Sequence, residues 1–484
     1  MPYVAQEIQA TLDMFKQGLV TKSGTLVPDI AKDWNLASGF QAYNLEAPAK
    51  VLVPQLTPLR NVTARKSGKG KQVEYKAITA LNNTNLNGWV AEGTAASIVQ
   101  TSTSDITAVY RSMALADKVT FESQWAGQGF GDIKSLAVTN LLRATMIQEE
   151  NNILFGQNST AATSTQQSPG AVGAAATLAT PTTLTTGGTI GAATAYYFKQ
   201  TVVTGMGESL PSAASATVTT GGGATNSITV TPVATAGQPV LGYRIWASTA
   251  ANGTYYPVVA ANCTSSSSGT LNGISWFTNG QALVITSIPT TGAAIPAADN
   301  TSSANAYNGL LAQIFGGASA TITALNGTLT TTAINTLFQG MWNTGRADPN
   351  MVIANAQESI KITALTLGAG APYFIVPAGG QGDATANFRV ARFTNAATGS
   401  EVPITVHPSL PQGTMLALST RLPGWYVPTD IDSVWALDLP QDYIEIDYPP
   451  TQSNPFWQVE VRLFGTLKLY LPLLQGVLTG INIS

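Results

Sequence analysis

The sequence predicts an α+β protein that carries an inserted all-β sandwich, and three observations support this class. A long helical pattern covers residues 131–156. Between Glu150 and Arg346, about 195 residues contain only four charged side chains, yet Tyr, Trp and Val recur there at strand-like spacing. The stretch 457–471 alternates and then becomes apolar throughout, as expected of a strand that enters a buried sheet.

Composition favours a protein that packs against other protein surfaces. Of the 484 residues, 44% are hydrophobic and only 10% are charged, against roughly 25% charged in ordinary soluble domains. The net charge of -3 gives no global basic field, so the composition does not indicate free nucleic acid as an electrostatic partner. The single cysteine, Cys263, excludes an intrachain disulfide framework. Because neither a signal peptide nor a transmembrane-length apolar run is present, we expect folding in a reducing cytoplasm and no membrane association.

The N-terminal segment has one helical face and little else to form a core. Spacings of three and four residues place its apolar side chains on one face: Val4, Ile8, Leu12, Phe15 and Leu19. Residues 20–58 contain four prolines and no periodicity. We expect an extended arm that docks on another surface, with a frayed terminus as the alternative.

Residues 60–78 predict a basic β-hairpin. Val62 and Ala64 alternate with polar neighbours, Ser67–Gly70 supplies turn residues, and alternation resumes from Val73. A phosphate-binding loop is disfavoured, because Gln72 follows Gly70-Lys71 and the glycine spacing is wrong for a Walker motif. The hairpin is either a solvated tip or a loop that clamps a neighbouring subunit. Its basic residues are Arg60, Arg65, Lys66, Lys69, Lys71 and Lys76.

The helix at 131–156 has a capping acid at Asp132 and a glycine at Gly156, where a C-cap is expected. Its apolar residues form two opposite stripes, so we expect it to be covered on both sides. One stripe contains Ile133, Leu136, Ala137, Ala144, Ile147, Leu154 and Phe155, and the other contains Val138, Leu142, Met146 and Ile153.

The charge-poor stretch predicts a β-sandwich over 178–290, joined by flexible connectors at 157–177 and 291–305. Short strands separated by Gly-, Pro-, Asn- and Ser-rich turns are typical of that architecture. The expected strands are 193–203, 214–219, 227–232, 242–248, 255–260, 274–278 and 283–285. Helices are expected at 307–315 and 332–345, followed by a mixed α/β region from 350 to about 448.

Catalytic, cofactor-binding and metal-binding patterns are missing from the sequence. The only histidine, His407, has no second ligand at metal spacing and no nucleophile elbow to serve, so a structural or exposed role is expected. The acids Asp442, Glu445 and Asp447 are interpreted as the polar face of a strand and turn, with cation binding as the disfavoured alternative. We therefore predict no catalytic site, no cofactor and no enzyme activity.

The order of these elements resembles the major capsid proteins of tailed bacteriophages, whose HK97-like fold is shared with encapsulins. EENNILFG at 149–156 is similar to the end of the family's spine helix, and EVPITVHPSLPQGTMLAL at 401–418 to a passage of its axial domain. GESLPS at 207–212 and GYRIWAS at 242–248 are similar to strand–turn patterns of immunoglobulin- or fibronectin-like domains.

The resemblance implies an HK97-like α+β fold with an inserted Ig-like sandwich. The implied segments are an N-terminal arm (1–58), an extended loop (59–118), a peripheral domain (119–156, 304–348 and 456–484) with spine helix 131–156, the insertion (157–303) and an axial domain (349–455). The basic residues of the extended loop and the apolar face of the arm become candidate inter-subunit contacts.

The resemblance further implies hexamers and pentamers that close into an icosahedral head around double-stranded DNA, bound without sequence specificity. Because the arm begins almost at Met1, a separate scaffolding protein is expected, with a portal and decoration proteins as further partners. Assembly would take place in the bacterial cytoplasm and the product would be the virion. The alternatives are an encapsulin-like compartment, another virion protein of the tail or head decoration, or an unrecognised enzyme.

Overall fold

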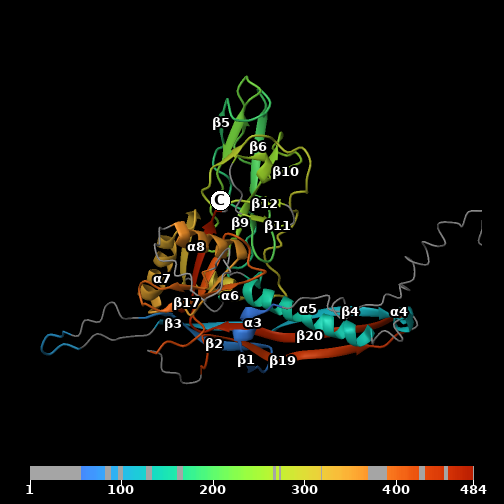
Figure 1. Ribbon diagram of the computed structural model, residues 1–484, viewed down its shortest axis with the longest axis vertical. Helices are drawn as coiled ribbons and strands as arrows, with labels where there is room; N and C mark the ends of the chain where they lie inside the picture. Colours follow the sequence, from blue (N-terminus) through green and yellow to red (C-terminus); the bar gives the residue numbers. More distant parts are fainter. Residues whose placement is uncertain are drawn as a thin grey trace, which may run out of the picture. The chain divides into compact units, whose positions relative to one another are not determined.

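The computed structural model describes residues 56–81, 89–95, 102–126, 133–160, 167–264, 269–271, 274–317, 319–368, 390–424, 431–451 and 456–482 (Figure 1). The chain divides into two compact units. The first contains 114–146 and 443–462, and the second contains 56–113, 147–442 and 463–484. The arm residues Val4, Ile8, Leu12, Phe15 and Leu19 lie outside the described residues. None of the described helices is long and apolar enough to cross a membrane.

The first unit packs part of a long helix on strand residues. It contains the end of β4 (Arg111–Thr120), α4 (Phe121–Ala126), the start of α5 (Ile133–Phe155), the end of β19 (Trp435–Tyr448) and the start of β20 (Phe456–Leu469). Leu141 of α5 is buried against Val459 and Val461. The ammonium of Lys134 lies 3.4 Å from the centre of the Trp457 ring and 3.4 Å from Asp447 Oδ2. The predicted helix and the polar role of Asp447 are confirmed.

The predicted hairpin at 60–78 is wrong. Residues Pro58–Val62 form a short helix, α3, because Pro58 suits the first turn of a helix. Strand β1 (Ala64–Ser67) pairs in parallel with β19, with Ala64 opposite Ala436. The true hairpin is formed by β2 (Gln72–Ala80) and β3 (Ser102–Val109), with Gln72 opposite Val109.

The glycines at the predicted turn explain this difference. A Cβ on Gly68 would lie 2.6 Å from the Tyr110 hydroxyl, so glycine is needed there for close packing and not for a hairpin turn. Gly68 also donates its N–H to Leu439 O at 3.0 Å, which continues the pairing of β1 with β19. The segment therefore links two sheets.

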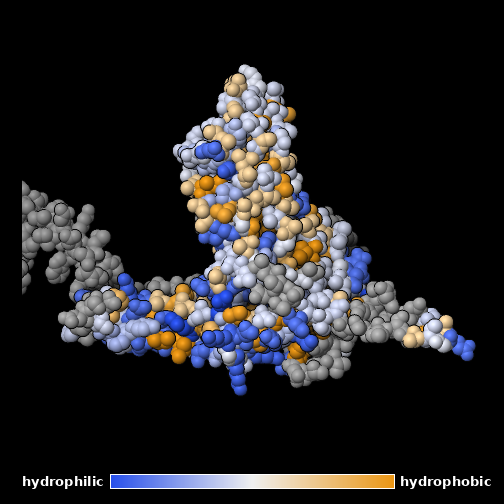
Figure 2. All heavy atoms as spheres, turned by 180° about the vertical axis from the view of Figure 1, so that it is seen from behind, coloured by the Kyte–Doolittle hydropathy of each residue, from blue (hydrophilic) through white to orange (hydrophobic). Residues whose placement is uncertain are grey.

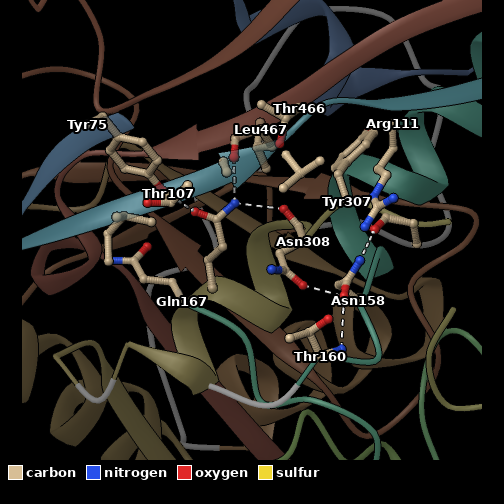
Figure 3. A pocket seen from close by; sticks show the side chains of 15 residues that line it. Tyr75, Thr107, Arg111, Asn158, Thr160, Gln167, Tyr307, Asn308, Thr466 and Leu467 are labelled. Carbon is tan, nitrogen blue, oxygen red and sulfur yellow. Dashed lines mark hydrogen bonds between the residues drawn. The ribbon is translucent and has the colours of Figure 1, made fainter. Parts of the chain in front are cut away.

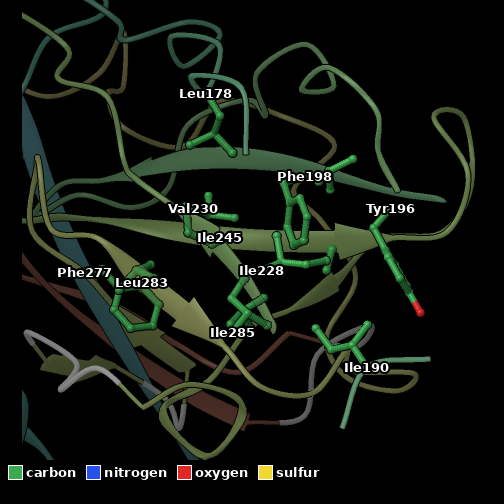
Figure 4. Packing of buried hydrophobic residues seen from close by; sticks show 13 residues of the cluster. Leu178, Ile190, Tyr196, Phe198, Ile228, Val230, Ile245, Phe277, Leu283 and Ile285 are labelled. Carbon is green, nitrogen blue, oxygen red and sulfur yellow. The ribbon is translucent and has the colours of Figure 1, made fainter. Parts of the chain in front are cut away.

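Two sheets with a shared core make up the insertion in the second unit. One has the order β10-β9-β6-β7 and the other β13-β8-β5, with a separate pair β11-β12. Their bounds are β5 Thr182–Leu184, β6 Ala195–Val203, β7 Val218–Thr219, β8 Ser227–Val230, β9 Gly242–Ser248, β10 Tyr256–Pro257, β11 Gly269–Leu271, β12 Ile274–Trp276 and β13 Leu283–Ile285. Phe198, Ile228, Ile245 and Leu283 are fully buried between the sheets (Figure 4). The sandwich is confirmed, while its Ig-like relationship stays a prediction.

The few charges of this stretch serve internal contacts. The buried Arg244 guanidinium pairs with Glu208, which also accepts the Thr201 hydroxyl. Asp299 accepts the N–H groups of Gly173 and Thr301 at 2.7 and 2.9 Å. Figure 2 shows a sandwich surface that is mostly pale, with few strongly hydrophilic residues. The segments on either side of the sandwich are thus hydrogen-bonded to each other at Gly173 and Asp299, while their expected role as flexible connectors stays a prediction.

The thiol of Cys263 is partly buried in the sandwich, and burial raises its pKa to about 11. A raised pKa leaves less thiolate, and thiolate is the reactive form. At pH 8 we expect iodoacetamide to modify native Cys263 about 200-fold more slowly than an ordinary thiol of pKa near 8.5. Alkylation followed by mass spectrometry, with the same protein in urea as the control, measures this ratio. Equal rates in the two states would contradict the prediction.

A six-stranded mixed sheet completes the second unit. Its order is β14-β21-β18-β15-β17-β16, and α7 and α8 contact its strands. The strands are β14 Thr321–Gly327, β15 Met351–Ala354, β16 Arg392–Thr394, β17 Glu401–Val406, β18 Met415–Leu418 and β21 Gly476–Ile481. The helices are α6 Leu310–Gly316, α7 Thr331–Gly345 and α8 Ala356–Gly368, and Ala260–Asn262 and Pro472–Leu474 form 3-10 turns. The sheet thus joins 321–327 and 476–481 to strands from 349–455.

Candidate functional site

A buried polar joint lies at the end of α5, within the second unit. We use this name for Arg60, Arg65, Glu149, Glu150 and His407. Both carboxylates and the imidazole are buried, with exposed fractions of 0%, 1% and 0% for Glu149, Glu150 and His407. Carboxylates are found at such depth only when hydrogen bonds and opposite charges compensate for lost hydration.

Glu150 connects three segments through its two oxygens. Oε1 accepts the Leu59 N–H at 2.9 Å, and Oε2 accepts the Arg60 N–H at 2.6 Å, so the carboxylate satisfies the first turn of α3. Ser409 donates its N–H to His407 Nδ1 at 3.1 Å, which leaves the ring proton on Nε2. That nitrogen donates to Glu150 Oε1 at 2.7 Å.

Glu149 is held by two arginines. Arg60 Nε donates to Glu149 Oε2 at 2.7 Å, and Arg65 donates to the other oxygen of the same carboxylate. Arg65 also contacts Asp442 Oδ1 at 2.7 Å. The joint therefore fixes α3, β1, the end of α5 and the turn after β17 to one another, and it offers no water-accessible carboxylate for chemistry.

The two ends of the insertion meet directly beyond this joint. Gly309 donates its N–H to Gly156 O at 2.7 Å. The side chain of Asn158 donates to Ala306 O at 2.8 Å, and its N–H donates to Asn308 Oδ1 at 2.8 Å. A Cβ on Gly205 of the sandwich would lie 1.9 Å from Cδ1 of Phe155, so only glycine permits this close approach to the end of α5.

A small cavity of about 120 Å³ lies beside these ends (Figure 3). Gln313 stands in its wall, donates to Asn308 O and Leu467 O at 2.7 and 2.9 Å, and accepts the Tyr75 hydroxyl at 3.2 Å. Burial raises the pKa of Tyr75, so this hydroxyl stays a donor. The 15 lining residues include no carboxylate, thiol or imidazole, and no group of three metal-binding side chains occurs in the described residues.

The six basic residues predicted as one group have different surroundings. Arg60 and Arg65 belong to the joint. Lys66 Nζ lies 3.9 Å from Asp432 Oδ2, and Lys76 pairs with Asp105 across the β2–β3 hairpin at 3.1 Å. Lys69 and Lys71 are exposed and make no ion pair with the described residues.

Sequence reasoning missed the joint itself. It expected a structural or exposed His407, and the structure gives the buried structural role. The usable signal was a pair of adjacent acids, Glu149 and Glu150, between the apolar stripes of a helix in a charge-poor chain. Their partners lie 84 to 257 residues away, and no local pattern reveals them.

Comparison with known proteins gives one family match. Residues 252–422, about a third of the chain, match the model of the SU10 major capsid protein family. No curated protein matches the chain.

Similar solved structures include a capsid chain of cyanophage A-1(L), with 12% identity, coverage of 89% of this chain and 93% of that one, and a TM-score of 0.41. A chain of Mycobacterium phage Bobi has 10% identity, coverage of 91% and 96%, and a TM-score of 0.39. An encapsulin of Synechococcus elongatus PCC 7942 has 14% identity and a TM-score of 0.22, and the match covers 36% of this chain and 57% of that one.

Proposed function

We propose that this chain, a tailed-phage major capsid protein with an HK97-like fold, forms hexamers and pentamers that close into an icosahedral head around double-stranded DNA. The family match over 252–422 carries this proposal. The role is structural, and the protein's place is the virion.

The physical character of the chain supports assembly with copies of itself. The β2–β3 pair is a sheet of only two strands, and two-stranded sheets are marginally stable by themselves, so it gains from packing on a neighbour. A surface with few charges loses little hydration free energy when another protein surface packs against it. The division into N-terminal arm (1–58), extended loop (59–118), peripheral domain, insertion (157–303) and axial domain (349–455) is part of the same proposal.

The candidate inter-subunit contacts follow from where charge is left over. Arg60 and Arg65 are engaged inside the subunit, and Lys66 and Lys76 face Asp432 and Asp105. Lys69 and Lys71 are therefore the favoured contacts of the extended loop. The apolar face of the arm remains a second proposed contact. We further propose a separate scaffolding protein, a portal, decoration proteins and sequence-independent packaging of DNA, with assembly in the bacterial cytoplasm.

Electron microscopy of the full-length protein tests the proposal. Expressed alone and together with its phage's scaffolding protein, it is expected to form closed shells, tubes, or rings of five and six subunits. A monodisperse monomer under both conditions would contradict the capsid role.

Removing the sandwich is expected to leave assembly intact. Because Asn158 contacts the backbone of Ala304 and Ala306, residues 159–303 can be replaced by a short glycine linker between neighbouring points of the chain. We expect shells with a smooth surface, seen by microscopy, and unchanged rings of subunits. A deletion variant that is folded by circular dichroism but never assembles would instead place the sandwich in the lattice contacts.

A further inference from the structure

A groove of about 560 Å³ lies in the second unit, between the end of α7 and the residues that follow β18. Trp342, Leu422 and Pro423 give it apolar walls, and Arg346, Asp348 and Arg421 are its charged residues. Both arginines are exposed.

Arg346 occupies a backbone position that ordinarily takes glycine. It follows the last residue of α7 with φ 50° and ψ 34°, and its N–H caps the carbonyls of Met341 and Trp342. Residues with a side chain adopt this left-handed backbone conformation at an energetic cost. Glycine is therefore the usual residue directly after the end of a helix. Among the described residues, only Ala193, Asn326 and Arg346 are non-glycine residues with positive φ. An arginine at this point therefore indicates a use for its side chain.

The guanidinium of Arg346 is held over the groove wall, 5.9 Å from the centre of the Trp342 ring. The one carboxylate in the lining is already engaged: Asp348 Oδ1 accepts Asn395 Nδ2 at 3.0 Å, Thr398 Oγ1 at 2.8 Å and Ser400 Oγ at 2.6 Å. Neither Arg346 nor Arg421 makes an ion pair with any described residue. With two arginines and one aspartate in its lining, the groove has a net positive charge.

We propose that this groove binds an acidic side chain, flanked by apolar residues, from a second copy of this chain. The proposal rests on the proposed capsid role, in which neighbouring copies are the abundant partners. Arginine and tryptophan are enriched at protein interfaces, and a guanidinium suits a carboxylate as its partner.

The chain carries segments of the required composition. Glu445 is exposed, makes no ion pair with the described residues and stands beside Ile444, which is 40% exposed. A DNA backbone is less suitable as the occupant, because a duplex binds through many cations spread along its phosphates, and two arginines between apolar walls do not follow that path.

The substitution Arg346→Gly separates a binding role from a structural one. Glycine relieves the left-handed backbone, so the thermal midpoint of the unassembled protein is expected to stay the same or rise. Losing one charged contact per subunit is expected to raise the protein concentration needed for half-maximal assembly about tenfold at low salt. Arg421→Gln is expected to have the same effect, while the matched control Arg392→Gln, in an exposed ion pair of β16, is expected to have none.

The occupant can be captured directly in assembled particles. A photo-reactive benzoylphenylalanine in place of Leu422 is irradiated in particles that mix unlabelled and ¹⁵N-labelled copies. We expect mass spectrometry to find cross-links between the two labels, to a peptide that contains Asp or Glu.

Cross-links only within one copy, to DNA or to a different protein would overturn the proposal, as would normal assembly of both arginine variants. A fall in thermal midpoint that accounts for lost assembly would likewise assign the arginines a structural role. If the wild-type chain forms no particle or ring at all, the capsid role itself fails, which is a distinct result.

Discussion

Replacing Glu150 by alanine is expected to lower the free energy of unfolding by about 3–5 kcal/mol. The loss leaves the Leu59 and Arg60 N–H groups and the His407 imidazole without their acceptor, all in a buried site. Unpaired buried donors carry their full desolvation penalty. Urea denaturation at pH 7 measures the change.

Two further variants make this result specific to the joint. Glu150→Gln keeps one acceptor oxygen but turns an NH₂ group toward a donor, so its loss should fall between wild type and Glu150→Ala. Glu445→Ala removes an exposed carboxylate of β19 and should change stability by less than about 0.5 kcal/mol. A loss below 1 kcal/mol for Glu150→Ala would show that water enters the joint and satisfies its donors.

Gly309→Ala is expected to destabilise the protein by about 3 kcal/mol, the upper end of what overpacking usually costs. The new Cβ would lie 2.6 Å from Asn152 O, 2.7 Å from Ile153 O and 2.8 Å from Gly156 N. These are backbone atoms at the end of a helix, and they cannot move aside as a side chain can.

Gly222→Ala is the matched control, since a Cβ there meets nothing within 4 Å. Thermal unfolding of the two variants should therefore differ clearly, with Gly222→Ala close to wild type. Equal midpoints for both would mean that the end of α5 and the chain at Gly309 separate without cost.

The sequence predicts the elements well where local periodicity determines them. The helix at 131–156 is found as Ile133–Phe155, and two sandwich strands are found with their predicted bounds, Gly242–Ser248 and Leu283–Ile285. Alternation of apolar and polar residues and the presence of turn residues are local properties of the sequence. They can therefore be recognised without knowledge of the fold.

Pairing is where prediction from the sequence fails. Ser67–Gly70 has the composition of a hairpin turn, but β1 finds its partner in β19, more than 350 residues away. The joint likewise depends on residues that are remote in the sequence. Glu150 becomes a buried acceptor only when α3 and the turn at His407 pack against the end of α5. Such contacts depend on tertiary packing, and a single sequence gives no distance between remote segments.

The contact between Gly156 and Gly309 also bears on the order in which the chain folds. Bringing together two points about 150 residues apart in a disordered chain costs roughly 4 kcal/mol of loop-closure entropy. A sandwich that folds first shortens the effective loop, because its own strands bring the two points close. Folding of the insertion would then precede the meeting of α5 with α6, and a variant slow to form the sandwich would be slow to complete the rest of the second unit.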